Sequence, residues 1–234
     1  MLVFVCFLLV AFAGIVICLF RPFNPDNSRL CGRLFGKVCL PLLGVRLEVE
    51  GLHRLENFAP SVVVANHLSN LDLFVFGSVI PPRTVSVGKK SLRYLPLFGQ
   101  VYWLAGNIMI DRSNRDRSIN AMDEISAAMM SRRSSIWIFP EGTRSQGKHL
   151  GAFKKGAFHI AIQTQAPIMP ICASNYPVSI QLKEWRSGTV KIAILPPIAT
   201  KGLEVSDIDQ LMDKTRTQME STIARLDAEV ASLR

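Results

Sequence analysis

The chain has 234 residues and a formal net charge of +9, and hydrophobic residues make up 49% of it. This length suffices for one domain with a buried core, and no Pro/Gly/Ser-rich stretch divides the chain into two. Basic runs interleaved with aromatic residues do not occur, which argues against nucleic-acid binding, whereas the basic excess favours an anionic membrane surface and phosphorylated ligands.

The N-terminal segment, residues 1–20, carries no charged side chain. As a helix rising about 1.5 Å per residue it would reach roughly 30 Å, the thickness of a bilayer core, so it predicts a transmembrane anchor. A cleaved signal peptide fits less well, because no basic region precedes the apolar run and no small-x-small cleavage site follows it. Four basic residues and only Asp26 as an acid occur at 21–37, which predicts that the rest of the chain lies on the cytoplasmic side.

The next segment, LCGRLFGKVCLPLLGVRLEV from Leu30, mixes apolar residues with three basic ones. Two interpretations are open: a helix that lies in the membrane interface, or a helix packed in the core. We therefore predict an anchor and interfacial helix over 1–46, the main domain over 47–202, and an amphipathic helix over 203–234.

Short apolar runs alternate with helical patterns through the main domain. Strands are expected for LEVEGL from Leu47, SVVVA from Ser61, TVSVG from Thr84, NIMI from Asn107, SSIWIFP from Ser134, APIMPICA from Ala166 and TVKIAIL from Thr189. Helices are expected from Leu73, over 116–130 and from Lys154, with a Pro/Gly-marked loop at LPLFGQ from Leu95. This alternation predicts an α/β fold with a mostly parallel sheet flanked by helices, whose ligands gather at the carboxyl ends of the strands.

The last segment places apolar side chains three or four residues apart from Ile208 to Leu233, which predicts a long amphipathic helix. Ser206 with Asp209 resembles a capping box at its start. The apolar stripe is expected to pack on its own domain, and pairing with a partner chain is the alternative.

The first chemical motif is NHLSNLD, which follows the predicted strand at Ser61. His67 and Asp72 are five residues apart, too far around a helix to face each other, so they can meet only through a turn. Asp72 would then accept a hydrogen bond from one imidazole nitrogen while the other faces substrate. Such a pair can remove a proton from a hydroxyl but supplies no nucleophile; a purely structural pair is the alternative.

The second motif, FPEGTRS, follows another predicted strand. Gly142 permits close approach of the backbone to a ligand, and Arg144 offers a planar fork that suits phosphate. Glu141 is either a substrate ligand or the salt-bridge partner of Arg144. A surface turn without function is the alternative for the whole heptapeptide.

Cations also follow two other predicted strands. Arg112 comes after NIMI, and Lys89 and Lys90 come after TVSVG. Cations recurring at one sheet edge suggest convergence on a phosphate, although each could instead face solvent. Lys154, Lys155 and Gly156 either extend this group of cations or form the solvated start of a helix, and for Lys154 the second interpretation is preferred.

Cysteine and histidine spacings indicate no further chemistry. The five cysteines form no C-x-x-C pair, and His149 and His159 stand at no ligand spacing, so neither a disulfide framework nor a metal site is expected. Cys172 lies in the hydrophobic run PIMPICA, which predicts an inert buried thiol.

Four motifs in series, NHLSNLD, GNIMIDR, FPEGTRS and APIMPI, resemble those of the glycerolipid acyltransferase family, over about Leu47 to Pro197. The stretch VGKKSLRYLPLFGQVYWLAGN resembles the bacterial members that acylate lysophosphatidic acid. The resemblance implies transfer of a fatty acyl group from acyl-CoA or acyl-acyl carrier protein, a co-substrate rather than a cofactor, to the sn-2 hydroxyl of that lipid. It also implies a place in the bacterial inner membrane.

The resemblance further implies roles for individual residues. His67 would be the general base and Asp72 its orienting partner, with no covalent acyl-enzyme. The remaining expected substrate contacts are Glu141, Gly142 and Thr143 for the acceptor, Arg112, Arg144 and Lys89 for its phosphate, and Pro167 and Pro170 for an acyl-binding wall. Ala166 departs from the valine more usual in the fourth motif.

Two other functions stay open on the sequence. One is acylation of another acceptor by the same chemistry, such as glycerol 3-phosphate or a different lysolipid. The other is a non-catalytic membrane protein that holds anionic phospholipid on its basic face. His67 and Asp72 count against the second, because lipid binding alone would not need them.

Overall fold

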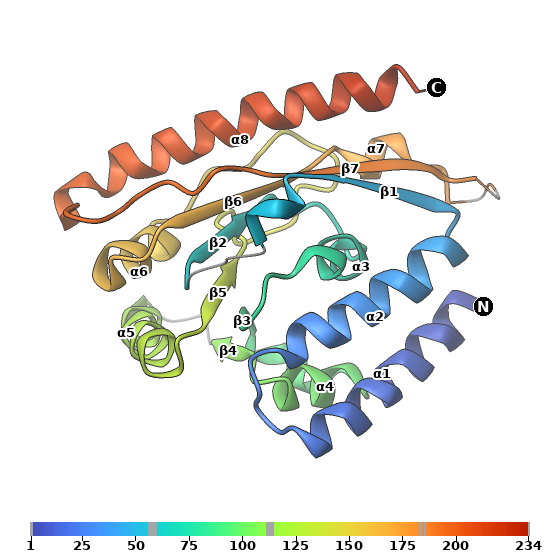
Figure 1. The fold of residues 1–234 in the computed structure, drawn as a ribbon, viewed down its shortest axis with the longest axis horizontal. Helices are drawn as coiled ribbons and strands as arrows, with labels where there is room; N and C mark the ends of the chain where they lie inside the picture. The colour runs from blue at the N-terminus through green and yellow to red at the C-terminus, as the bar shows by residue number, and fades with distance from the viewer. Residues whose placement is uncertain (1, 56–59, 111–114, 183, 185, 234) are drawn as a thin grey trace.

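The computed structural model describes residues 2–55, 60–110, 115–182, 184 and 186–233. These residues form a seven-stranded sheet between two helical layers (Figure 1). The strands are β1 (Val45–Glu50), β2 (Val62–Ala65), β3 (Thr84–Lys89), β4 (Ile108–Ile110), β5 (Ser135–Ile138), β6 (Ile168–Ala173) and β7 (Gly188–Ile194).

The strand order is β1-β7-β6-β2-β5-β3-β4. The strands from β6 to β4 all run parallel, whereas β7 is antiparallel to β6 and pairs in parallel with β1. The predicted α/β fold with a mostly parallel sheet is therefore confirmed. Because β2, β3, β4, β5 and β6 point the same way, their carboxyl ends meet at one edge.

The helices cover both faces of the sheet. They are α1 (Leu2–Phe20), α2 (Asn27–Leu42), α3 (Asp72–Val75), α4 (Phe98–Leu104), α5 (Arg115–Arg132), α6 (Gly156–Thr164), α7 (Tyr176–Ser179) and α8 (Ile208–Ala231), with 3-10 turns η1 (Leu52–Leu55), η2 (Phe76–Val79), η3 (Lys90–Tyr94) and η4 (Val205–Asp207). In Figure 1, α1, α2 and α4 lie together on one side, and α8 runs along the other.

Strand β2 is apolar at every position because both of its faces are buried. Val63 belongs to the hydrophobic cluster beneath α1 to α4, whereas Val62 and Val64 belong to the cluster beneath α5, α6 and α8. A strand buried on both faces needs apolar residues at every position, so its sequence shows no alternation.

Helix α1 is apolar along its whole length. The segment Val3–Phe20 has a mean hydropathy of 3.1 and is long and apolar enough to cross a membrane by length and composition. Val10 and Cys18 are buried against the domain, whereas outward side chains such as Leu9 and Phe20 stay exposed. A helix with this exposed apolar face is compatible with membrane association.

The segment from Leu30 forms a helix that ends at Leu42, and the chain enters β1 at Val45. One face of α2 is buried through Phe35 and Cys39, as the core-helix interpretation expects. Close packing on η2 depends on glycine, because a Cβ at Gly32 would lie 2.9 Å from the Gly77 carbonyl oxygen.

Two local predictions differ from the structure. The loop expected at LPLFGQ is present over 95–97, but helix α4 begins at Phe98, because Gly99 allows the helix to approach the carbonyl groups of Leu92 and Arg93, 2.6 Å from where a Cβ would lie. The capping box at the C-terminal helix uses Glu204 and Asp207 on η4 instead of Ser206 and Asp209.

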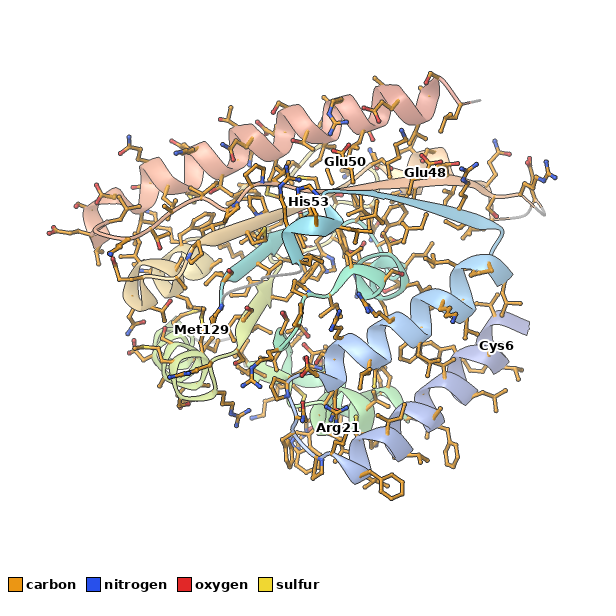
Figure 2. The ribbon with its side chains drawn as sticks, viewed as in Figure 1. Cys6, Arg21, Glu48, Glu50, His53 and Met129 are labelled. Atoms are coloured by element: carbon orange, nitrogen blue, oxygen red, sulfur yellow. The ribbon has the colours of Figure 1, made fainter. Side chains whose placement is uncertain are left out.

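The C-terminal helix packs on its own domain, as expected. Met219 and Leu226 of α8 are fully buried in the cluster that also contains Cys172, whose thiol pKa is raised by burial. Arg225 of α8 forms an ion pair with Glu50 of β1 and a second one with Glu229 within α8. Figure 2 shows Glu50 and Glu48 on β1 beside α8.

Candidate active site

The predicted pair of His67 and Asp72 lies where β2 ends. Asn66 fixes the exit from the strand, because its amide exchanges two hydrogen bonds of 2.9 Å with the backbone of Ala173 at the end of β6. A turn then carries the chain to Asp72 at the start of α3. His67 Nδ1 lies 2.5 Å from Asp72 Oδ2. The two residues therefore meet through a turn, as their spacing predicts.

Asp72 is buried and held by several donors. Oδ2 also accepts a 2.9 Å hydrogen bond from the Leu68 N–H, and Oδ1 accepts one from the Tyr176 hydroxyl. Since the carboxylate accepts hydrogen bonds, it places the proton of the neutral imidazole on Nδ1 and leaves Nε2 as the basic nitrogen.

The plane of the imidazole ring is set by Phe139, which follows β5. The two ring centroids are 4.1 Å apart and the planes are inclined by 15°. The His67 side chain is 19% exposed, so part of the ring reaches a cavity while the rest is packed. Stacking and the Asp72 contact together restrict the ring to one orientation.

Glu141 contacts the backbone of the turn that contains His67 and Asp72. Its Oε1 accepts a 2.6 Å hydrogen bond from the His67 backbone N–H, and its Oε2 accepts one of 2.8 Å from the Gly151 N–H. Its side chain is buried and is not among the described residues that line the cavity. These contacts favour a role in holding the backbone of His67; the expected direct contact with acceptor stays a prediction.

Burial raises the pKa of the Glu141 carboxyl, and its two backbone hydrogen bonds oppose the rise. The native state therefore keeps this proton to a higher pH than the unfolded state does. The free energy of unfolding should fall as pH rises from the ordinary glutamate pKa of about 4.3 through the raised folded-state value, and then level off.

This pH dependence is measurable in detergent micelles as the unfolding free energy of the wild type minus that of Glu141→Gln. Glutamine cannot titrate, so this difference isolates the Glu141 carboxyl, and we expect it to fall as pH rises. A difference that stays constant or rises across the same pH range would contradict the prediction.

The turn after β5 provides the next part of the site. Gly142 has φ +71°, a backbone conformation that favours glycine. Thr143 and Arg144 follow it with exposed side chains. All three residues line a cavity of about 1100 Å³ that also reaches His67 and Asp72.

Cations from separate elements line the same cavity. Lys89 comes from the end of β3, Arg144 from the turn after β5, and Lys154 from just before α6. Lys154 was interpreted as a solvated helix start; it is exposed and also faces the cavity. The expected contribution of Arg112 lies outside the described residues. The Ser145 N–H donates to the His67 carbonyl oxygen at 2.8 Å, which places the turn with Arg144 beside His67. Three cations that line one cavity make it suitable for a phosphate.

The rest of the cavity is largely apolar. Its walls include Phe4 and Phe7 of α1 and Leu95 and Phe98 of the segment leading into α4. Pro170 is buried within β6, paired with Val64 of β2, and is not among the described lining residues. The apolar wall therefore includes the N-terminal helix, while the expected role of the proline motif stays a prediction.

Tyr176 is the main site residue that sequence reasoning missed. It is fully buried, and burial together with the charge of Asp72 raises the pKa of its hydroxyl, which keeps it a hydrogen-bond donor. It follows the carboxyl end of β6, as His67 follows the end of β2. Extending the strand-end rule to β6 would have directed attention to this residue.

Comparisons with known proteins show the family to which the chain belongs. A family model described as acyltransferase matches residues 46–174. The 1-acyl-sn-glycerol-3-phosphate acyltransferases of Salmonella typhimurium and Escherichia coli K12 are each 41% identical over 224 residues, covering 96% of this chain and 91% of those proteins. The human 1-acyl-sn-glycerol-3-phosphate acyltransferase alpha is 38% identical over 214 residues, covering 91% of this chain and 75% of that protein.

A solved structure shares the fold. The crystal structure of the 1-acyl-sn-glycerophosphate acyltransferase from Thermotoga maritima superposes with a TM-score of 0.75 at 23% identity, covering 96% of this chain and 92% of that one. At this identity the likeness concerns the fold alone.

Proposed function

The chain belongs to the acyltransferase family, and from that membership we propose that it acylates lysophosphatidic acid at the sn-2 hydroxyl to form phosphatidic acid. The donor is the thioester of coenzyme A or of acyl carrier protein. The observation that carries the proposal is the His67–Asp72 pair in a largely apolar cavity that Lys89, Arg144 and Lys154 also line. The names of the bacterial and human relatives support the same reaction.

The chemistry requires one base and no enzyme nucleophile. His67 Nε2 takes the proton of the acceptor hydroxyl while the hydroxyl oxygen attacks the thioester carbonyl carbon. The carbon–oxygen bond forms, the carbon–sulfur bond breaks, and His67 returns the proton to the leaving thiolate. Asp72 stabilises the imidazolium between these two transfers.

Lysophosphatidic acid matches both the cationic and the apolar residues that line the cavity. Its phosphate suits Arg144 and Lys89, and Lys154 adds a third cation. Its acyl chain, or that of the donor, suits the apolar walls. We extend the proposal to Gly142 and Thr143 as backbone contacts of the acceptor, because both line the cavity beside Arg144.

The site of action that we propose is the bacterial inner membrane, with the catalytic domain on the cytoplasmic side. Helix α1 supports this, since it exposes apolar side chains outward and also supplies Phe4 and Phe7 to the cavity wall. A lipid acceptor could thus reach the site along the membrane surface. We propose 1–46 as the membrane-binding part, although α2 within it also packs on the domain core.

Acceptor selectivity distinguishes this function from acylation of a different acceptor by the same chemistry. With either thioester as donor, the purified protein in detergent or vesicles should show a much higher kcat/KM for lysophosphatidic acid than for glycerol 3-phosphate or lysophosphatidylcholine. Glycerol 3-phosphate lacks the acyl chain, and the choline headgroup adds a cation near Arg144. Preference for either of these acceptors would overturn the proposed substrate.

A further inference from the structure

The residue that the proposed chemistry leaves unused is Tyr176, whose buried hydroxyl contacts the carboxylate of the catalytic pair. We infer that Tyr176 is a positioning residue: its hydroxyl holds Asp72 Oδ1 so that Oδ2 faces His67 Nδ1. The inference rests on the proposed function, since it assigns Tyr176 a role in that same base.

The backbone around Tyr176 is fixed. Its N–H donates to the Ser174 carbonyl at 2.7 Å, and its own carbonyl accepts from the Ile180 N–H at 2.9 Å. The ring is fully buried, in the cluster that also contains Phe74 and Leu68. A phenol held this firmly presents its hydroxyl at one place, and that place is Oδ1 of Asp72.

The hydrogen bonds around the hydroxyl have one direction. Ser69 Oγ donates to the Tyr176 hydroxyl at 3.3 Å, and the Tyr176 hydroxyl donates to Asp72 Oδ1. On the other oxygen, Oδ2 accepts from the Leu68 N–H and from His67 Nδ1. With donors on both oxygens, the carboxylate plane cannot rotate without breaking one of these bonds.

This restraint matters because, among the described contacts, Leu68 and His67 both bind Oδ2 and only the Tyr176 hydroxyl binds Oδ1. A carboxylate free to rotate would present Oδ2 to His67 only part of the time. Misplacement of a catalytic group by about 1 Å can cost on the order of 100-fold in rate. Tyr176 thus acts on the rate through Asp72, without touching substrate.

The direct test is Tyr176→Phe, which removes one oxygen and keeps the ring. We expect kcat for acyl transfer to lysophosphatidic acid to fall about 10-fold, as loss of a hydrogen bond to a charged group implies, with both KM values within about twofold of wild type. As a control, Tyr94→Phe removes a phenol hydroxyl from a side chain that is 72% exposed and should leave kcat unchanged. A kcat change below twofold, or a raised KM at constant kcat, would overturn the inference.

A double-mutant comparison separates positioning from a general structural role. If Tyr176 acts through Asp72, then adding Tyr176→Phe to Asp72→Asn should lower the remaining kcat by less than twofold. Losses that multiply in the double variant would overturn the inference. This comparison also serves if Tyr176→Phe alone fails to fold, because the Asn background leaves no unpaired buried charge.

Different results would overturn the proposed function and the role of Tyr176. A wild-type protein that does not acylate lysophosphatidic acid overturns the proposed function. An active wild type whose Tyr176→Phe variant keeps its kcat overturns only the role of Tyr176.

Discussion

Replacing His67 with alanine should lower kcat for acyl transfer by about 10²- to 10⁴-fold, the usual contribution of a general base. The variant should stay folded, because the imidazole lies partly in the cavity and its backbone N–H still reaches Glu141. Membrane association should also persist, since the exposed apolar face of α1 is unchanged. Steady-state kinetics, thermal unfolding and vesicle flotation measure the three properties.

The matched control is His159→Ala on α6, where the imidazole is exposed to solvent. This variant should keep kcat within about twofold of wild type. If His67→Ala retains more than about a tenth of the wild-type kcat while remaining folded, the role of His67 as general base is wrong.

Replacing Arg144 with alanine should raise KM for lysophosphatidic acid about 10- to 100-fold, because a charge-assisted contact with phosphate is lost. Lysine at this position should restore only part of the affinity, since an ammonium lacks the planar fork of a guanidinium. Lys148→Ala provides the control, because Lys148 is exposed in the same loop and is not among the described residues that line the cavity.

An acceptor without phosphate sharpens this prediction. Monoacylglycerol offers the hydroxyl and the acyl chain but no phosphate, so Arg144→Ala should not weaken its use further. Equal loss for both acceptors would show that Arg144 supports the loop rather than the phosphate, and would contradict the assignment.

The His67–Asp72 contact could be predicted because it depends on local spacing. A strand end, a five-residue separation and a helix start bring the two side chains to one turn. Lys89 and Arg144 could be placed together for a similar reason, since parallel strands bring their carboxyl ends to one edge.

Contacts between distant segments could not be predicted in this way. Glu141 binds the backbone of His67 and Gly151, and Tyr176 binds Asp72 from a segment 104 residues away in sequence. These contacts depend on how strands and turns pack in three dimensions. The spacing of residues along the sequence does not report that packing. The FPEGTRS motif therefore identified Glu141 as a candidate functional residue, but it did not indicate that its carboxylate binds the backbone N–H groups of His67 and Gly151.

The N-terminal helix shows another limit of sequence reasoning. Its composition predicts a membrane segment, and the helix is observed over Leu2–Phe20. Composition does not indicate that Phe4 and Phe7 also line the cavity that reaches His67. The position of α1 follows from packing against α2 and α4, so a helix with an exposed apolar face also lines the cavity that reaches His67.

Thiol release and phosphatidic acid formation, followed together in one reaction, test whether acyl transfer to lysophosphatidic acid is direct. Purified protein would be given a labelled acyl thioester with and without lysophosphatidic acid. We expect thiol and phosphatidic acid to form in equal amounts, both to require the acceptor, and both to be lost in His67→Ala. Thiol release without acceptor, or consumption of thioester with no phosphatidic acid formed, would contradict direct acyl transfer to lysophosphatidic acid.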